Sequence, residues 1–247
     1  ADFYQVLGML EERLGSHFVP VQLPIGTGET FTGLIDLIDM QAVTYEETSL
    51  GAKFHVDEIP EDLVERALEY REKLLESVAE FDDHLLEKFL EGGKIAPEEI
   101  IAALRKATVA LKAVPVTCGS AFKHKGVQRL LDAVLRFLPA PSDVAAVTGH
   151  KPDSEEEAVR EAKDDAPFSA LAFKIMTDPF VGRLSFIRVY SGSLSAGSYI
   201  YNVSTGKRER VSRLLEMHAN DRTELKEVHA GDIVAVVGLK DTTTGDT

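Results

Sequence analysis

The stretch from Val114 to Lys123 has the composition of a strand followed by a ligand-binding turn. Val114 to Cys118 is a short apolar run bounded by turn formers, which predicts a buried strand. Gly119-Ser120-Ala121 follows at the carboxyl end of that strand, and its small side chains let a ligand approach the backbone N–H groups. Open α/β sheets bind ligands at this edge, so the turn is a candidate binding loop. A plain strand-to-helix connection has the same local composition.

Two helices are predicted to flank this core. Gly126 to Leu138 is amphipathic and is stopped by Pro139. Its apolar face consists of Val127, Leu130, Leu131, Val134 and Leu135. The other helix is predicted near the start of the chain, from Asp2 to Leu14, with Gly15 as its C-terminal glycine. Its predicted inner face consists of Phe3, Val6, Leu7, Leu10 and Leu14.

The residues from 15 to 111 are predicted to form a structured insertion between these elements. Strands are predicted at 19–26, 31–37 and 41–46, followed by helices from Pro60 to Leu90 and from Pro97 to Leu111. The longer helix has an apolar stripe, its predicted core face, made of Leu63, Ala67, Tyr70, Leu74, Val78, Phe81 and Leu85. Its opposite side carries an acidic stripe of Glu65, Glu69, Glu72, Glu76, Glu80, Asp83 and Glu87.

The charge of the chain is strongly negative and unevenly distributed. The formal net charge is −14, and residues 57–100 alone carry 15 acidic and 5 basic side chains. Nucleic-acid phosphates repel such a surface, so any nucleic-acid contact is expected from the C-terminal half. Cys118 is the only cysteine, which excludes an internal disulfide. No apolar run is long enough to span a membrane.

The C-terminal third is predicted to be all β. Residues 142–166 are rich in Asp, Glu, Ala and Pro and predict an exposed linker with at most a short hairpin. Beyond them, short segments rich in β-branched and aromatic residues alternate with turn glycines, which predicts a small closed barrel. The predicted strands are 169–176, 184–190, 198–203, 208–216 and 233–239.

Two groups of residues resemble translational GTPases, and bacterial elongation factor G most closely. Gly-Ser-Ala-Phe-Lys-His-Lys-Gly-Val-Gln at 119–128 resembles the last guanine-recognition loop, although His124 departs from the expected Asn. Several phrases resemble the second domain of that family: 173–175, 182–184, 188–197, 210–220 and 244–247. The resemblance implies the C-terminal part of a P-loop GTPase α/β domain at 1–141, with an α+β insertion at about 15–111. It further implies a linker at 142–166 and a translation-factor β-barrel at 167–247.

The resemblance also implies where ligands and partners bind. In the family, backbone N–H groups equivalent to those of Ser120, Ala121 and Phe122 bind the guanine carbonyl oxygen. The barrel rests on small-subunit ribosomal RNA, for which the candidate contacts are Arg183, Arg188, Arg208, Arg210 and Arg213. The insertion meets the stalk protein of the large subunit, for which the candidates are Glu65, Glu69, Glu72 and Glu76. Both sets also fit the plainer interpretation of a solvated surface.

The implied activity is GTP-driven movement of tRNA and mRNA through the ribosome. GTP or GDP with Mg²⁺ is the implied ligand set of the full-length parent. A phosphate-binding Gly-x-x-x-x-Gly-Lys-[Ser/Thr] motif, an Asp-x-x-Gly motif and an Asn-Lys-x-Asp motif do not occur in this chain. The chain alone is therefore expected to bind no cofactor or metal and to be inactive. We expect a cytoplasmic monomer that contacts neither membrane nor DNA.

Two other interpretations stay open at this point. A ribosomal protection protein of the same GTPase class has the same architecture. An acidic helical adaptor fused to a β-barrel, with no link to nucleotides, is the rival class of binding module. A phosphate-loop motif upstream of the chain would distinguish a GTPase from the adaptor.

Overall fold

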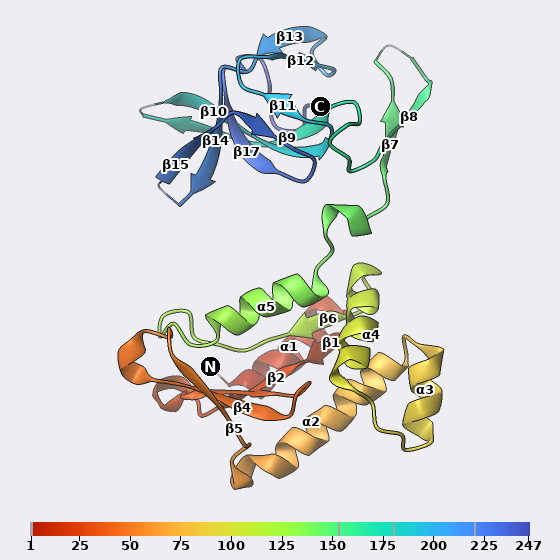
Figure 1. The fold of residues 1–247 in the computed structure, drawn as a ribbon, viewed down its shortest axis with the longest axis vertical. Helices are drawn as coiled ribbons and strands as arrows, with labels where there is room; N and C mark the ends of the chain where they lie inside the picture. Colours follow the sequence, from red (N-terminus) through yellow and green to blue (C-terminus); the bar gives the residue numbers. More distant parts are fainter. Residues whose placement is uncertain (1, 153, 180, 220) are drawn as a thin grey trace. The chain divides into compact units, whose positions relative to one another are not determined.

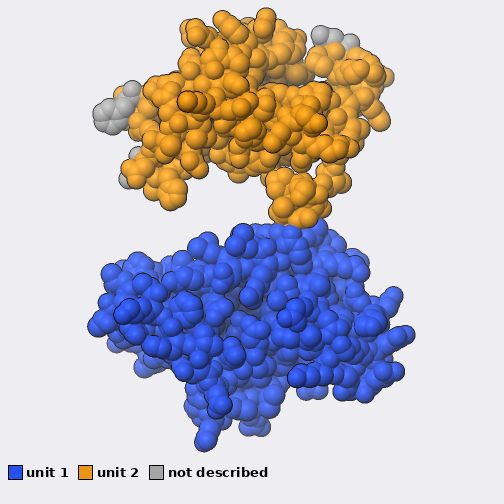
Figure 2. Space-filling view, in the orientation of Figure 1, with its two compact units in different colours: residues 1–138 blue, residues 139–247 orange. Residues whose placement is uncertain are grey.

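The computed structural model describes residues 2–152, 154–179, 181–219 and 221–247. The chain forms two compact units, residues 1–138 and 139–247, which Figure 2 colours separately. Asn220, which closes one of the phrases quoted above, lies outside the described residues. Figure 1 shows the elements of each unit.

The described residues of unit 1 form two small sheets and five α-helices. Its first sheet pairs β1 (Phe18–Pro20) in parallel with β6 (Val114–Val116), and Val19 lies opposite Pro115. The second sheet is antiparallel, with its strands in chain order, and consists of β2 (Gln22–Ile25), β3 (Gly33–Asp36), β4 (Gln41–Tyr45) and β5 (Phe54–Asp57). The predicted strands at 31–37 and 41–46 are therefore confirmed, whereas the single strand predicted at 19–26 is divided at Val21 into β1 and β2, which belong to different sheets. Strand β5, whose side chains are all exposed, was not predicted.

The helices of unit 1 are α1 (Phe3–Leu14), α2 (Glu61–Ala79), α3 (Asp83–Leu90), α4 (Pro97–Val109) and α5 (Val127–Phe137). Short 3₁₀ turns lie at η1 (Gly28–Thr30) and η2 (Glu47–Ser49). The Asp2 carboxylate caps α1 by accepting from the amides of Tyr4 and Gln5, and Gly15 ends that helix in the left-handed conformation, as predicted. The core joins α2 and α4 to both sheets.

The prediction of a single helix from Pro60 to Leu90 is wrong. The chain leaves α2 after Ala79 and starts again at Asp83, because the Asp82 side chain accepts hydrogen bonds from the amides of His84 and Leu85. A side-chain cap of this kind competes with the continuing helix. Asp83 and Glu87 therefore belong to α3 and not to the acidic side of α2.

Three apolar surfaces in unit 1 were predicted to be inside and are partly or wholly exposed. On α1, Leu7 is buried while Val6 and Leu14 face solvent. The predicted inner face of α5 is likewise exposed: Leu130 is 49% and Leu135 80% accessible. The buried residues of α5 are instead Ala133 and Phe137. Strand β6 is half-exposed rather than buried, because among the described residues β1 alone pairs with it.

Unit 2 begins with a 3₁₀ turn, η3 (Pro141–Asp143), and an exposed hairpin of β7 (Val147–His150) and β8 (Glu157–Arg160), so the short hairpin expected in the linker is present. A five-stranded antiparallel sheet follows, in the order β15-β14-β17-β10-β9. Its strands are β9 (Ser169–Asp178), β10 (Gly182–Ser191), β14 (Arg213–His218), β15 (Asp221–Leu225) and β17 (Ile233–Val237). Two ribbons complete the unit: β11 (Leu194–Ser195) with β16 (Glu227–Val228), and β12 (Tyr199–Asn202) with β13 (Lys207–Arg210).

These sheets enclose one main core, which contains Ile187, Val189, Val211, Leu214 and Val234 among others. The predicted strand 208–216 is broken at Val211 and Ser212, where the chain passes from the ribbon into the large sheet. The amide of Val211 donates to Ser198 O and that of Ser212 to Val237 O, so the break itself joins two sheets. The result is a barrel-like unit assembled from separate antiparallel sheets, rather than from one continuous ladder of the described strands (Figure 1).

The C-terminal segment links two edges of this unit. Asp246 O accepts from the amide of Ala172 on β9, and Thr247 O accepts from the amide of Val203 just beyond β12. Ala172 O in turn accepts from the amide of Gly245. Among the described residues, no helix is both long and apolar enough to cross a membrane.

Candidate functional site

The predicted binding loop lies between β6 and α5 and is closed into a small hairpin. The amide of Ser120 donates to Lys125 O at 2.8 Å, and the amide of Lys125 donates to Ser120 O at 3.0 Å. At the tip, the amide of His124 donates to Ala121 O, and His124 adopts a positive φ of 56°. The tip therefore has a defined backbone conformation without a regular secondary structure.

Two lysines attach the loop to distant segments of unit 1. Lys125 Nζ lies 2.7 Å from Glu47 Oε1 and donates to Phe31 O at 3.1 Å, and its side chain is only 4% accessible. Lys123 Nζ donates to Glu29 O at 3.0 Å. The hydrogen bond from Lys125 holds the pKa of the Glu47 carboxyl below its usual value. The loop is thus fixed before any ligand binds, which reduces the entropy cost of binding.

Close backbone packing adds to this fixation. Gly51 lies against the loop, where a Cβ would come within 1.9 Å of His124 O, and its φ is +77°. Gly126 follows the loop at φ +90°, and a Cβ there would lie 3.0 Å from Cys118 O. The Gln128 amide nitrogen donates to Gly51 O at 2.7 Å and so connects α5 to the same segment.

The backbone donors of the loop are not equivalent. The Ser120 amide is already committed to Lys125 O, whereas the amides of Ala121 and Phe122 have no recorded acceptor among the described residues. Ala121 is exposed and Phe122 is 96% accessible, so both donors lie at the surface of unit 1. Of the three predicted positions, Ala121 and Phe122 are therefore the ones that can offer an amide to a carbonyl oxygen.

Cys118, just before the loop, has a structural environment. Its amide donates to the Gln22 side-chain oxygen at 3.3 Å, which ties the end of β6 to β2. Burial raises the pKa of the Cys118 thiol to about 12. A thiol in this state is a poor nucleophile. The described residues also contain no cluster of three or more His, Cys, Asp or Glu side chains that could hold a metal ion.

The five predicted RNA-contacting arginines have different environments in unit 2. Arg208, Arg210 and Arg213 are exposed on β13 and β14. Arg188 is half-buried, with its guanidinium carbon 5.0 Å from the centre of the Tyr190 ring. Arg183 donates to the backbone carbonyls of Lys240 and Thr242. Arg183 and Arg188 therefore take part in the packing of the unit, and the other three are available for phosphate contacts.

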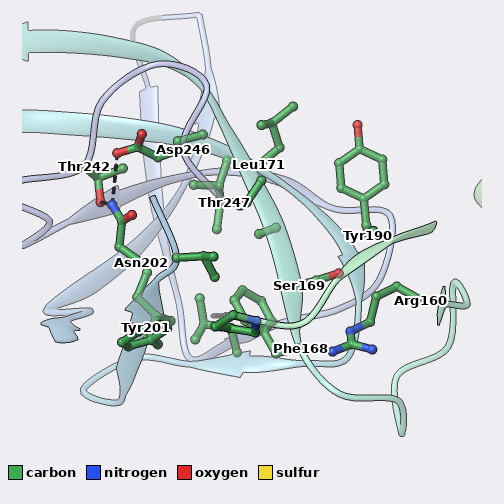
Figure 3. A pocket seen from close by; sticks show the side chains of 18 of the residues that line it. Arg160, Phe168, Ser169, Leu171, Tyr190, Tyr201, Asn202, Thr242, Asp246 and Thr247 are labelled. Atoms are coloured by element: carbon green, nitrogen blue, oxygen red, sulfur yellow. Dashed lines mark hydrogen bonds between the residues drawn. The ribbon is translucent and has the colours of Figure 1, made fainter. Parts of the chain in front are cut away.

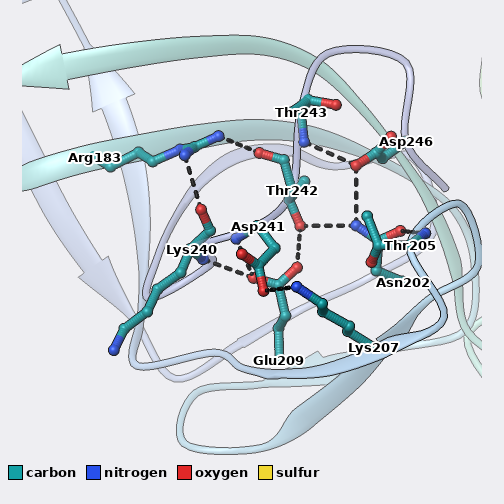
Figure 4. A network of polar contacts seen from close by, with 10 residues as sticks. All are labelled: Arg183, Asn202, Thr205, Lys207, Glu209, Lys240, Asp241, Thr242, Thr243 and Asp246. Carbon is teal, nitrogen blue, oxygen red and sulfur yellow. Dashed lines mark hydrogen bonds and ion pairs between the residues drawn. The ribbon is translucent and has the colours of Figure 1, made fainter.

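Arg183 belongs to a polar network that holds the loop from Lys240 to Asp246 (Figure 4). At its centre, the buried Glu209 carboxylate accepts from the amides of Lys240 and Asp241 and from the Thr242 hydroxyl. Burial alone would raise the pKa of Glu209, but these hydrogen bonds outweigh it and lower the pKa. Sequence reasoning missed Glu209. Its position between two exposed arginines on a strand was the available signal, because alternate residues point to opposite faces.

A cavity of about 1020 Å³ lies within unit 2 (Figure 3). Its walls come from the β7–β8 hairpin, β9, β10, β12 and the C-terminal segment, and include the aromatic residues Phe168, Tyr190, Tyr199 and Tyr201. Arg160 reaches the wall from β8. No local sequence pattern predicts this cavity, because its lining residues are spread over a hundred positions of the chain.

The four predicted stalk-contacting residues lie on α2, and Glu65, Glu69, Glu72 and Glu76 are all exposed. Their stripe is interrupted by a counter-charge: Lys73 Nζ lies 2.6 Å from Glu69 Oε1. A lysine four residues along a helix lies on a neighbouring position, and its long side chain reaches back to the glutamate. The surface is acidic but partly compensated.

The fold and these surfaces define a class of architecture: a small α/β unit with a rigid strand–loop–helix edge, followed by a barrel-like all-β unit. Residues 167–247 match the family model described as elongation factor G domain 2. A crystal structure of a protein from Thermus thermophilus resembles the whole chain, with a TM-score of 0.75 and 28% sequence identity. The chain spans only 34% of that protein's length. The first of these likenesses supports a translation-factor domain at residues 167–247, and the second shows that a similar fold extends over the whole chain.

Proposed function

We propose that this chain is part of an elongation factor G that hydrolyses GTP to move tRNA and mRNA through the ribosome. One observation carries the proposal: the match of residues 167–247 to domain 2 of that factor. The geometry of unit 1 supports it, because the loop after β6 offers two neighbouring amides at the edge of a parallel strand pair. The exposed apolar faces of α1, α5 and β6 suit a unit whose sheet continues in a longer protein.

In this proposal, unit 1 supplies guanine recognition and not phosphate chemistry. The amides of Ala121 and Phe122 donate to the guanine carbonyl oxygen, while Lys123 and Lys125 keep the loop in place. The residues present fit the base of GTP or GDP, whereas the phosphates and Mg²⁺ require a glycine-rich loop that this sequence lacks. The residues holding those groups belong to the rest of the parent.

The partners follow from the charges of the two units. The exposed Arg208, Arg210 and Arg213 contact ribosomal RNA phosphates of the small subunit, and Arg183 keeps the adjoining loop in place. The acidic side of α2 faces the stalk protein of the large subunit, for which a basic surface is the matching chemistry.

A nucleotide-binding comparison tests the guanine role. In the full-length protein, Ala121→Pro removes one amide donor, and Ala121→Gly is the matched control that keeps it. We expect Ala121→Pro to bind GDP more weakly and to lose its preference over 2-aminopurine riboside diphosphate, which has no carbonyl at that position. The 247-residue chain itself should bind a fluorescent GDP analogue more weakly than micromolar.

A ribosome assay tests the overall activity. The full-length protein should hydrolyse GTP faster when ribosomes are added and should advance a bound mRNA by one codon. A parent that binds ribosomes without stimulated GTP hydrolysis would contradict the proposed activity. Release of tetracycline from ribosomes without mRNA movement would instead favour a ribosomal protection protein.

A further inference from the structure

The ribbon formed by β12 and β13 has an unusual outer face. Tyr199 lies directly opposite Arg210, and Tyr201 lies directly opposite Arg208. All four side chains are exposed, and the two tyrosines are 57% and 47% accessible. The alternate residues Asn202 and Glu209 are buried on the other face. The outer face is therefore a small array of two aromatic and two cationic side chains.

One of the arginines, Arg208, already contacts a tyrosine ring. The guanidinium carbon of Arg208 lies 5.2 Å from the centre of the diagonally placed Tyr199 ring. Such a stack keeps both groups flat and in place without burying either. Two residues along a strand span about 6.6 Å, which separates the two tyrosines enough for each to receive its own planar partner.

The charge of this face is entirely positive, although the whole chain carries −14. Glu209 points inward, and the neighbouring Lys207 is neutralised by Asp241, whose carboxylate is 2.9 Å away. No ion pair is recorded for Arg208 or Arg210 among the residues described. Positive side chains interleaved with exposed aromatic rings match the alternating phosphates and bases of a single nucleic-acid strand.

We propose that the outer face of the β12–β13 ribbon binds unpaired RNA nucleotides, with bases stacked on Tyr199 and Tyr201 and phosphates against Arg208 and Arg210. A double-stranded RNA hides its bases from stacking, so the ribbon selects loops, bulges or single strands. The cavity that Tyr199 and Tyr201 also border leaves space beside the rings for a base. The inference rests on the RNA partner of the proposed function and adds stacking to what would otherwise be phosphate contact alone.

The test is a fluorescence-anisotropy titration of the 247-residue chain with labelled eight-nucleotide RNAs at low salt. The probes are an adenosine oligomer, the same oligomer without bases, and a blunt duplex. We expect binding to the adenosine oligomer, and binding of the abasic oligomer at least about fivefold weaker. The wild-type comparison of these probes depends on no variant and so on no change in folding. Equal affinity for the adenosine and abasic oligomers, or no binding of either, would overturn the proposal.

Variants assign the effect to the ribbon. Tyr199→Ala with Tyr201→Ala should weaken binding of the adenosine oligomer about tenfold or more and abolish the difference from the abasic probe. The double Tyr→Phe variant should restore both, because stacking needs the ring and not the hydroxyl. Phe173→Ala is the matched control, since Phe173 is 41% exposed in the same unit but lies on β9. Wild-type affinity in a folded double-alanine variant would refute the stacking role.

The outcome is separable from that of the proposed function. The chain contains no tryptophan and six tyrosines, so tyrosine-fluorescence quenching by the adenosine oligomer that is lost when both Tyr199 and Tyr201 become alanine reports stacking on the ribbon. The double-alanine variant is tested in two assays. Loss of oligomer binding would support the ribbon site, and ribosome association that survives in the full-length protein would support the wider function independently. Ribosome binding without any oligomer binding would remove the inference and leave the proposed function standing.

Discussion

The ammonium of Lys125 lies 2.7 Å from the carboxylate of Glu47, a residue 78 positions earlier in the chain. This pair connects the loop after β6 to the turn after β4. The lysine is almost fully buried and the glutamate is 81% accessible. Replacing the lysine should therefore lower the stability of the loop more than replacing the glutamate.

Lys125→Met should loosen the loop. The substitution keeps the apolar stem but leaves the Phe31 carbonyl without its donor, at a cost of about 1–3 kcal/mol for a buried unpaired group. Hydrogen exchange followed by mass spectrometry should show faster exchange at residues 28–31 and 119–126. Glu47→Gln is the control and should have a smaller effect, because water can solvate the exposed side chain. Unchanged exchange in Lys125→Met would show that backbone contacts alone hold the loop.

Gly51→Ala and Gly15→Ala form a matched pair for the close approach of two backbones. Both glycines have a positive φ, +77° and +62°, but only at Gly51 would a Cβ meet another atom, His124 O at 1.9 Å. Gly15→Ala should therefore lose about 1–2 kcal/mol from backbone strain alone. Gly51→Ala should lose clearly more, because the loop must also move. Guanidinium unfolding followed by far-ultraviolet circular dichroism reports unit 1, where all five described α-helices lie.

Equal losses in the two variants would mean that the segment around Gly51 moves away from the loop without cost. That result would contradict the rigid loop described above. Fluorescent GDP titration of the corresponding full-length variants would then show whether the loop position affects guanine binding.

Glu209 should give unit 2 an acid-sensitive loop. Its folded-state pKa is lowered from 4.5, so its contribution to stability is present above about pH 4.5 and is lost as the pH falls through the folded pKa. The protection of the amides at residues 240–246 against hydrogen exchange, corrected for the intrinsic rate at each pH, should fall over that range in the wild type and depend less on pH in Glu209→Gln. At neutral pH, Glu209→Ala should cost about 2–3 kcal/mol, because the amides of Lys240 and Asp241 lose their acceptor.

The exposed Glu216 on β14 provides the control for this prediction. Glu216→Ala should change stability by less than about 0.5 kcal/mol. The Asp246 carboxyl also has a lowered pKa, through its hydrogen bond from Asn202, so the difference between wild type and Glu209→Gln is the informative quantity. An identical pH profile in those two proteins would show that Asp246 and not Glu209 governs the loop.

Reversing the acidic side of α2 should slow association of the full-length protein with ribosomes. The changes are Glu65→Lys, Glu69→Lys, Glu72→Lys and Glu76→Lys. Surface charges act mainly on the association rate, and salt screens them beyond about 10 Å at 0.1 M. The defect should therefore be greatest at low salt in stopped-flow measurements and should fade as salt is added. Circular dichroism checks that α2 survives.

The fourfold Glu→Gln variant is the matched control for charge reversal. It removes the negative charges without adding positive ones and should give an intermediate rate. If the folded Glu→Lys variant associates with ribosomes at the wild-type rate at low salt, the acidic side of α2 serves only solubility and does not bind the ribosome. An equal defect at all salt concentrations would point to damaged packing.

The local pattern of the sequence was enough to predict most elements of this protein. The helix that ends at Gly15, the helix α5 and the alternating strands of unit 2 depend on neighbours a few residues apart. The binding loop was predicted in the same way, from an apolar run followed by small residues. Resemblance in long phrases then indicated the translation-factor barrel, to which residues 167–247 match independently.

Only the tertiary structure decided how those elements use their surfaces. The apolar face of α5 looks like a core face in the sequence, but periodicity cannot say whether this chain supplies the partner that covers it. The break at Asp82 arises because a side-chain cap outcompetes an otherwise continuous helical pattern. Three further features depend on strand register or on contacts between distant segments. They are the hydrogen bond of the Ser120 amide, the Lys125–Glu47 pair and the tyrosine–arginine face of the β12–β13 ribbon. Such contacts produce no periodic pattern in the sequence, because the segment between the two contacting residues can have almost any sequence.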